Sequence, residues 1–351
     1  MKLTVHLIAW NGAKYIPYLF ASLRTQTFTD WSLMVVDNHS EDGTVEAVKK
    51  ELQNFPVKSK LIENEKNLGF APGHNLAFKN TNSEYFLLLN QDMFLESDCL
   101  EKMVDYLDQN HGVSAVSPRL MRWNFSAVEK TQKAEAGFSN LIDALGLKVF
   151  KSRRVIEQCT GEVWSISEYK DKTTLDVFGV SGAFPMLRRK SVEKVLFRDG
   201  GFLDEDYHSY KEDVDLAWRL QQVGESAVVL LDAVAYHDRS GAGPRELGDR
   251  FAIQNKVSQS SWVRYHSYKN HLRTLYKNEY WQNVILDFPW ILWYELKKFV
   301  WFLFFDRTVL AGLREVWQGR ANLCQKRAEI VKTRQVGWSA IRQWWKNKEV
   351  V

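Results

Sequence analysis

The feature that most constrains the fold is a series of short, almost purely apolar runs that alternate with segments of helical spacing. The apolar runs are Leu3–Ala9, Ser32–Asp37, Lys58–Glu63, Tyr85–Asn90 and Val113–Ser117. The helical segments between them are Ala13–Gln26, Asp42–Asn54, Pro72–Lys79 and Ser97–Asn110. Strands that are apolar throughout are buried on both faces, as in parallel sheets covered by helices. The pattern therefore predicts an α/β fold with a mostly parallel central sheet flanked by helices.

The regular alternation stops in the middle of the chain. Arg119–Thr174 is polar and rich in turn signals, which predicts an irregular insertion that could form a flap over a site. Leu175–Leu187 then has the pattern of a strand, a turn and a second strand. A helix is predicted over Val214–Val223 and one more strand over Ser226–Leu231.

Composition excludes several classes of protein. The 351 residues are 45% hydrophobic and 26% charged, which excludes a disordered or collagen-like chain. The three cysteines are scattered and form no CxxC pair, so a disulfide scaffold or zinc module is not expected. The apolar run at the N-terminus is short and lacks the cleavage pattern of a secretory signal, which favours a cytoplasmic location.

Charge and tryptophan are unevenly distributed along the chain. Residues 261–351 carry 16 Lys and Arg against 7 Asp and Glu, whereas residues 1–260 carry 31 against 36. Nine of the 14 tryptophans also lie in residues 261–351. This asymmetry predicts an acidic catalytic domain over 1–260 and a basic, Trp-rich region over 261–351. The latter region is helical in pattern, with breaks predicted at Pro289 and Gly312.

The run Pro289–Phe305 is rich in Trp and Phe but contains Glu295, Lys297 and Lys298. A membrane-spanning helix needs about 20 largely uncharged residues, and each Lys at its centre costs roughly 2.5–3.5 kcal/mol. The segment is therefore predicted to lie on an anionic membrane surface rather than to cross it. The alternative is a helical hairpin packed on the catalytic domain or on a second subunit, which would make a homo-oligomer. No nucleic-acid-binding motif is present, so nucleic acid is not an expected partner.

Polar residues at strand ends are the candidates for chemistry, because open parallel sheets bind ligands beyond the carboxyl ends of their strands. Asn90 and Asp92 alternate with Gln91 and can face one ligand, and their oxygens suit Mg²⁺ or Mn²⁺ bridging a diphosphate. The alternative is an Asx turn that closes the strand. Asp37 ends another buried strand and could accept the N3–H of a uracil or thymine ring, or simply form a turn.

Acidic residues also gather where the later helix begins. Asp215 and Arg219 are spaced as a helical i, i+4 pair, for which an ordinary salt bridge is the favoured interpretation. Glu212 and Asp213 could complement the helix dipole, or one of them could act as a general base toward a hydroxyl.

Taken together, these segments resemble the inverting glycosyltransferases of family 2, which have the GT-A fold. The resemblance covers roughly residues 3–240, with the insertion as a gap, and the nearest subgroup is the rhamnosyltransferase-like branch. The matching motifs are, in order, LIAWN (7–11), VDNHSEDGT (36–44), NLGFAPGHN (67–75), LNQD (89–92), VSGAFPMLRR (180–189), GFLDE (201–205), YKEDVDLAWR (210–219) and YHDRSGAG (236–243). One departure is the triplet Asn90-Gln91-Asp92, which has one carboxylate fewer than the usual DxD motif and so weakens the expectation of metal dependence.

The resemblance implies roles for residues of the nucleotide pocket. Asp37 would contact the nucleotide base, Asn11 would lie near the nucleoside, and Asn67 and Asn75 would border the pocket. Asn90 would face the ribose or the metal.

The resemblance also implies the residues of the reaction centre. Asp92 would hold a divalent metal, Mg²⁺ or Mn²⁺, and His237 would lie near the diphosphate or the metal, although a lone histidine is more often structural. Asp213 would be the catalytic base, with Glu212 beside it. The loop next to the donor sugar and acceptor would consist of Ser181, Gly182 and Ala183.

The function implied is transfer of a sugar, with inversion, from a UDP- or dTDP-sugar to a hydroxyl of a polysaccharide or lipid-linked glycan. dTDP-rhamnose is among the candidate donors, and the inner face of the cell membrane is the expected location. A sugar-nucleotide pyrophosphorylase is an alternative, but Asn11-Gly12-Ala13 lacks its glycine-rich phosphate loop. A non-catalytic membrane-bound scaffold is another, and the presence of Asp37, Asp92 and Asp213 argues against it.

Overall fold

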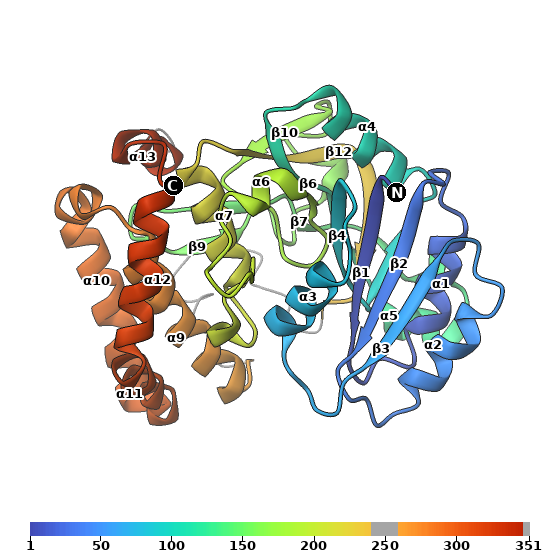
Figure 1. The fold of residues 1–351 in the computed structure, drawn as a ribbon, viewed down its shortest axis with the longest axis horizontal. Helices are drawn as coiled ribbons and strands as arrows, with labels where there is room; N and C mark the ends of the chain where they lie inside the picture. Colours follow the sequence, from blue (N-terminus) through green and yellow to red (C-terminus); the bar gives the residue numbers. More distant parts are fainter. Residues whose placement is uncertain (240–258, 347–351) are drawn as a thin grey trace.

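A computed structural model describes residues 1–239 and 259–346 of the protein. Its centre is a ten-stranded sheet in which eight strands follow the order β10-β12-β6-β11-β4-β1-β2-β3 (Figure 1). The strands of this order are β1 (Leu3–Ala9), β2 (Trp31–Asp37), β3 (Ser59–Glu63), β4 (Tyr85–Asn90), β6 (Val113–Trp123), β10 (Thr174–Val177), β11 (Met186–Arg188) and β12 (Ser226–His237). The other two, β5 (Met93–Leu95) and β7 (Phe138–Ala144), pair with β12 and β6 respectively. Strands β3, β2, β1 and β4 are mutually parallel, as are β6 and β12, while β11 runs antiparallel between β4 and β6. The expected mostly parallel sheet is confirmed.

Helices cover both faces of this sheet. On one face lie α1 (Ile16–Arg24), α2 (Thr44–Leu52) and α4 (Cys99–Gln109), which pack with β1, β2 and β4 in one hydrophobic cluster. On the other face lie α3 (Phe70–Lys79), α6 (Arg189–Glu193) and α7 (Glu212–Gln222), which form a second cluster. Strands of this sheet are apolar throughout because side chains from both faces enter a core.

The register brings the carboxyl ends of three strands to one edge. Ala9 of β1 pairs with Asp37 of β2, and Ile8 pairs with Asn90 of β4. The loop that precedes β11 reaches the same edge, because the amide of Asn90 donates to the carbonyl of Ala183 over 3.1 Å.

The segment predicted as an irregular insertion is largely ordered into short elements, so that prediction was wrong. Strand β6 runs on to Trp123, and its extension pairs with β7 (Phe138–Ala144). The other elements are α5 (Phe125–Thr131) and the strand pair β8 (Leu147–Val149) and β9 (Val155–Glu157). Leu175–Leu187 contains the two strands predicted for it: β10 pairs with β12, and β11 inserts between β4 and β6.

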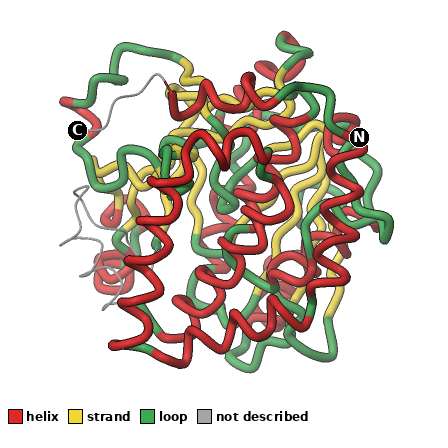
Figure 2. The backbone as a smooth tube through the Cα atoms, turned by 90° about the vertical axis from the view of Figure 1, so that its left-hand side faces the viewer, coloured by secondary structure: helices red, strands yellow, loops and turns green. Residues whose placement is uncertain are grey.

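The C-terminal region is a group of helices beside α7 (Figures 1 and 2). These are α9 (Ser261–Asn278), α10 (Trp281–Phe305), α11 (Ala311–Gln318), α12 (Arg320–Thr333) and α13 (Trp338–Lys346). Pro289 and Gly312 do not break helices as expected: Pro289 lies inside α10, on its exposed side, and Gly312 lies inside α11. The break comes at Asp306 instead. Within residues 1–239 and 259–346, no helix is both long enough and apolar enough to cross a membrane.

Candidate active site

Hydrogen bonds join the loops at the ends of β1, β2 and β4. The side-chain nitrogen of Gln91 donates to the carbonyl of Trp10 over 2.8 Å, and its side-chain oxygen accepts from the backbone amide of Trp10 over 2.9 Å. The Gln91 side chain therefore extends the hydrogen bonding between β1 and β4 by one step. A Cβ at Gly12 would lie 2.2 Å from the Gln91 side chain, so glycine leaves the room that Gln91 needs to make both bonds.

Asn11 and Asp37 hold one turn together. The Asp37 carboxylate accepts from the amide of Ser40 over 2.9 Å and from its hydroxyl over 2.5 Å. The amide of Asn11 donates to the same hydroxyl over 3.0 Å, and its side chain accepts from the amide of Glu41 over 2.9 Å. Asp37 is only 1% exposed. Both residues therefore shape the strand ends, and their contact with a nucleotide stays a prediction.

The loop before α3 is attached to this turn through Asn38, a residue for which the sequence suggested no role. The Asn38 side chain donates to the carbonyl of Gly69 over 3.0 Å and accepts from the side chain of Asn64 over 2.9 Å. Asn67 closes the same loop, because its side-chain oxygen accepts from the amide of Gly69 over 2.8 Å. The available signal was the position of Asn38 beside Asp37 in the motif VDN.

The Asn75 side chain is buried against residues 202–205 and does not line an open pocket. Its side-chain oxygen accepts from the amides of Phe202 and Leu203, each over 3.0 Å. Its nitrogen donates to the carbonyl of Leu203 over 2.9 Å and to the Glu205 carboxylate over 3.0 Å. These four bonds use its full capacity, so Asn75 positions the segment that leads to α7.

His237 and Asp92 come together from β12 and the end of β4. His237 Nε2 lies 3.5 Å from Asp92 Oδ1, and its Nδ1 lies 2.9 Å from Asp143 Oδ2. Burial alone would lower the pKa of His237, but the carboxylates of Asp92 and Asp143 outweigh it and hold the pKa well above its usual range. Asp143 comes from β7, inside the segment predicted to be irregular. In the sequence, Asp143 could have been recognised as the single carboxylate in the apolar run 141–145, because a buried carboxylate needs a charged partner.

Asp92 and His237 are the side chains that could hold a divalent cation. A cation there would have to replace the proton that the Asp92 and Asp143 carboxylates favour on His237. The Asp143 carboxylate on the far ring nitrogen is the usual outer partner of a metal-binding histidine. Among the described residues there is no group of three or more His, Cys, Asp or Glu able to hold a metal. The remaining ligands would therefore come from substrate phosphate and water, as is common for Mg²⁺.

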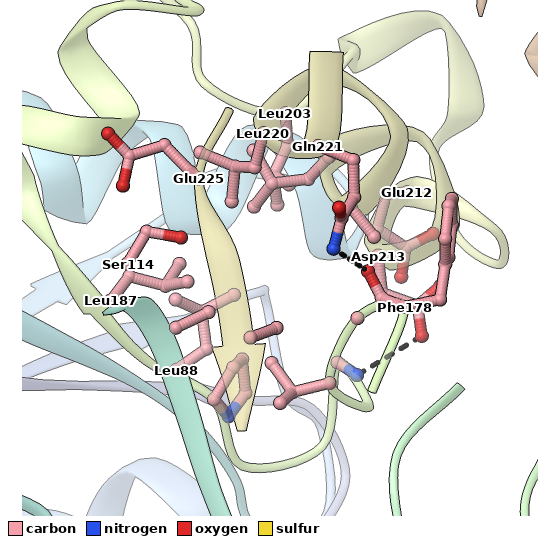
Figure 3. Close-up of a pocket in the computed structure, with 18 of the residues that line it drawn as sticks. Leu88, Ser114, Phe178, Leu187, Leu203, Glu212, Asp213, Leu220, Gln221 and Glu225 are labelled. Atoms are coloured by element: carbon pink, nitrogen blue, oxygen red, sulfur yellow. Dashed lines mark hydrogen bonds between the residues drawn. The ribbon is translucent and has the colours of Figure 1, made fainter. Parts of the chain in front are cut away.

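The loop Ser181–Ala183 connects the metal side of the site with the N-terminus of α7. The amide of Gly182 donates to Asp213 Oδ2 over 3.1 Å (Figure 3). Ser181 donates to the Glu157 carboxylate over 2.7 Å, and Glu157 also pairs with Arg239. Glu157 belongs to β9, so the supposed insertion contributes to the wall of the site.

Glu212 and Asp213 lie at one end of an apolar cavity of about 30 Å³ that runs beneath α7 (Figure 3). Leu88, Leu187 and Leu220 are among its lining residues. Burial, followed by repulsion from Asp213, raises the pKa of Glu212 to about 8. Glu212 Oε2 has no hydrogen-bond partner among the described residues. This environment favours the neutral form of the Glu212 carboxyl.

Asp215, two positions further on, has a structural role. Arg219 donates to it over 2.9 Å, and both side chains are buried. The salt-bridge interpretation of this pair is confirmed. The motif residues Ser240–Gly243 that follow His237 in sequence lie outside the described residues.

Comparison with known proteins identifies the family. The family model described as "Glycosyl transferase family 2" matches residues 4–196 of the chain. This chain belongs to glycosyl transferase family 2. An uncharacterized glycosyltransferase of Haemophilus influenzae is 27% identical over 117 residues, 33% of this chain and 36% of the relative. The Staphylococcus aureus poly(ribitol-phosphate) beta-N-acetylglucosaminyltransferase TarS is 29% identical over 113 residues, 32% of this chain and 20% of the relative.

The match to a third glycosyltransferase is longer. The uncharacterized glycosyltransferase YfnE of Bacillus subtilis is 23% identical over 271 residues, 71% of this chain and 68% of YfnE. The chain spans only about a third and a fifth of the lengths of the Haemophilus and Staphylococcus relatives.

The fold comparison agrees with the family. The crystal structure of GalNAc-T7 with UDP, GalNAc and Mn²⁺ superposes with a TM-score of 0.57 at 12% identity, covering 80% of this chain and 49% of that one. At this identity the likeness concerns the fold alone, and it confirms the expected GT-A fold. The chain is therefore a member of glycosyl transferase family 2 with the GT-A fold and a helical C-terminal region.

Proposed function

We propose that this glycosyltransferase transfers a sugar from a nucleoside-diphosphate donor to a hydroxyl of a polysaccharide or lipid-linked glycan, with inversion. The observation that carries the proposal is the loop Ser181–Ala183, whose backbone contacts both Asn90 and Asp213. Such a loop would hold the general base at a fixed distance and angle from the diphosphate of the donor, and in-line displacement requires this geometry.

Asp213 is the proposed general base. Its carboxylate would take the proton of the attacking hydroxyl, whereas burial and the nearby Asp213 raise the pKa of the neighbouring Glu212 carboxyl to about 8. Oδ2 of the Asp213 carboxylate accepts from the Gly182 amide, which fixes its direction. One displacement by the hydroxyl, with no covalent sugar–enzyme intermediate, inverts the anomeric centre.

Asp92 and His237 are the proposed protein ligands of Mg²⁺ or Mn²⁺. When bound, the ion supplies neutralising charge to the leaving diphosphate. Asp143 keeps the imidazole of His237 in one orientation, with Nε2 toward Asp92. Asn11, Asp37, Asn67, Asn75 and Asn90 are the proposed frame of the nucleotide pocket.

The named relatives support an acceptor of the cell envelope. TarS is named for poly(ribitol-phosphate), and a Staphylococcus epidermidis relative, 24% identical over 114 residues, is named as a teichoic acid poly(glycerol phosphate) polymerase. We therefore place this protein in synthesis of a cell-wall or capsular polysaccharide at the inner face of the membrane. UDP-sugars and dTDP-sugars, including dTDP-rhamnose, are the donors to test.

Nucleotide release from a panel of nucleotide sugars, with and without Mn²⁺, tests the proposal. We expect one UDP- or dTDP-sugar to be hydrolysed slowly without acceptor and to raise the melting temperature by mass action. Pyrophosphate exchange in place of nucleotide release would identify a pyrophosphorylase. Release of no nucleotide, together with no thermal shift, would identify a scaffold that retains the fold.

A further inference from the structure

Helix α10 has the reverse of the polarity expected for a surface helix. Its fully buried side chains are Asn283, Asp287, Lys298 and Phe302, three of which are polar. Every exposed position along α10 is apolar. The most exposed side chains are Phe305 at 73%, Phe304 at 70%, Ile285 at 65%, Trp281 at 62% and Trp293 at 61%. We call the exposed apolar side of Trp281–Phe305 the α10 face.

Polar contacts fix the rotation of the helix about its axis. Asp287 accepts two bonds from the Arg342 guanidinium, over 2.6 and 2.7 Å, and one from the Trp345 indole over 3.0 Å. The Asn283 side chain donates to the carbonyl of Trp338 over 3.1 Å. Turning the α10 face inward would break these bonds and remove Asp287 from the buried Arg153 guanidinium, which lies 3.1 Å away, and losing a partner of a buried charge is costly. The outward position of the apolar side is therefore built into the fold.

The pattern continues along the whole helix. At 1.5 Å per residue, 25 residues make a rod of roughly 37 Å. A contiguous apolar strip of this length is unusual on a water-exposed surface and indicates contact with a membrane or with another molecule. In Figure 1 the C-terminal helices form one side of the molecule, away from β1–β3.

Charge indicates which kind of surface covers the strip. The exposed positions of the α10 face include no acidic residue, and Arg307, Arg314 and Arg320 are exposed just beyond its C-terminal end. Residues 261–351 carry 16 basic against 7 acidic side chains. Some of these lysines pair with aspartates of the catalytic half, but two copies that met through this surface would still bring the exposed arginines near one another. An anionic lipid surface would attract the same charge, and its headgroup layer accommodates tryptophan such as Trp281 and Trp293.

We infer that α10 docks the protein on a membrane, lying in the interface with its apolar face in the lipid and its polar face bonded to the protein. The inner side of α10 is too polar for the helix to span the bilayer. None of the described helices is both long enough and apolar enough to do so. This inference does not depend on the sugar that is transferred, because it concerns a surface outside the residues assigned to catalysis.

Vesicle co-sedimentation of the full chain tests it. We expect binding to vesicles of phosphatidylcholine mixed with phosphatidylglycerol, and weaker binding to phosphatidylcholine alone. High salt should weaken the first only in part, because salt screens the charge attraction and not the apolar contact. The double variant Trp293→Ser/Phe304→Ser should lower the partition coefficient at least tenfold, since two exposed aromatic side chains no longer enter the lipid.

The matched control is Ile166→Ser, which removes an 80% exposed apolar side chain outside the α10 face and should bind as the parent does. Thermal unfolding and nucleotide release without vesicles should be unchanged in all variants, which separates this test from that of the enzymatic proposal. Failure of the parent to sediment with anionic vesicles would overturn the inference, as would equal binding by the double variant. A dimer that the double variant dissociates, without any lipid binding, would identify the face as a contact between copies instead.

Discussion

At the scale of single residues, two adjacent carboxyl groups have different environments. Glu212 is buried at the end of an apolar cavity, and the pKa of its carboxyl is raised to about 8. Asp213 is partly exposed and accepts the Gly182 amide. Different environments of this kind let a site keep one carboxyl neutral while the other is ionised.

The first prediction separates these two residues. Asp213→Asn should lower turnover roughly 10²-fold or more, the scale of a positioned general base, and leave the donor Kd nearly unchanged. Glu212→Gln keeps the size and the neutral state of Glu212, so it should retain activity within about tenfold at pH 7. Steady-state rates of nucleotide release with acceptor measure both. A Glu212→Gln loss as large as that of Asp213→Asn would contradict the assignment.

The second prediction concerns the metal pair. Asp92→Ala should abolish the part of the thermal shift by UDP or dTDP that depends on Mn²⁺, because His237 alone is a weak site. Asp232→Ala, which removes an exposed carboxylate from β12, is the control and should leave that shift intact. An unchanged Mn²⁺-dependent shift in Asp92→Ala would place the metal elsewhere.

At the scale of elements, the segment that leads into α7 depends on a helix from the far end of the chain. His208, Tyr210 and Lys211 all have positive φ angles, which cost of order 1 kcal/mol each in non-glycine residues. The Asn270 side chain of α9 donates to the carbonyls of Tyr207, Ser209 and Tyr210, over 3.0, 2.9 and 2.8 Å. One amide therefore holds the turn that aims Glu212 and Asp213.

The third prediction follows from this amide. Asn270→Ala should lower kcat several-fold or more while the donor KM changes little, because the turn positions the base and not the nucleotide. It should also lower the free energy of unfolding by about 1–3 kcal/mol, since buried carbonyls lose their donor. Asn82→Ala, at an exposed position in the loop before β4, is the control. A loss of stability without any fall in kcat would limit Asn270 to a structural role.

The sequence predicts elements well where the signal is local and poorly where it is not. The parallel strands were predictable because each is a contiguous apolar run, and the strand-end residues followed from the topology. Strand β7 was not, because Ser139, Asn140 and Asp143 interrupt its apolar pattern. The Asp143–His237 contact was not predictable either, because it joins residues 94 positions apart. Pro289 was expected to end a helix, but its ring is on the exposed side of α10, where the lost hydrogen bond is tolerated.

At the scale of the whole molecule, ion pairs bind the C-terminal helices to the catalytic half. Lys277 of α9 pairs with Asp204 and Asp215, all three fully buried. Lys326 of α12 pairs with Asp204 and Asp206. Removing one partner of a buried pair typically costs 3–5 kcal/mol, because the other charge stays buried. A chain cut after residue 260 would leave all three aspartates without these lysines. The positive charge of the C-terminal region is therefore partly internal to the fold.

The last prediction concerns the stability of the whole molecule against pH. His6 and His74 are fully buried between the sheet and α3, and both ring nitrogens of His74 lack a partner among the described residues. Burial, with a smaller contribution from Arg189, lowers the pKa of His6 to about 3, and burial followed by repulsion from His6 lowers the pKa of His74 well below its usual range. Below the unfolded pKa of 6.5 the unfolded chain binds protons that the folded chain does not.

The free energy of unfolding should therefore fall as the pH is lowered from 6.5, by up to about 1.4 kcal/mol per pH unit for each histidine. His74→Leu removes one of these protonations, so its denaturation midpoint should depend less steeply on pH over the same window. His111→Leu, at an exposed position, is the control and should keep the parent slope. Urea unfolding at several pH values measures all three proteins. If the His74→Leu slope equals that of the parent, His74 is already protonated in the folded chain, and its neighbours must include a group that stabilises the charge.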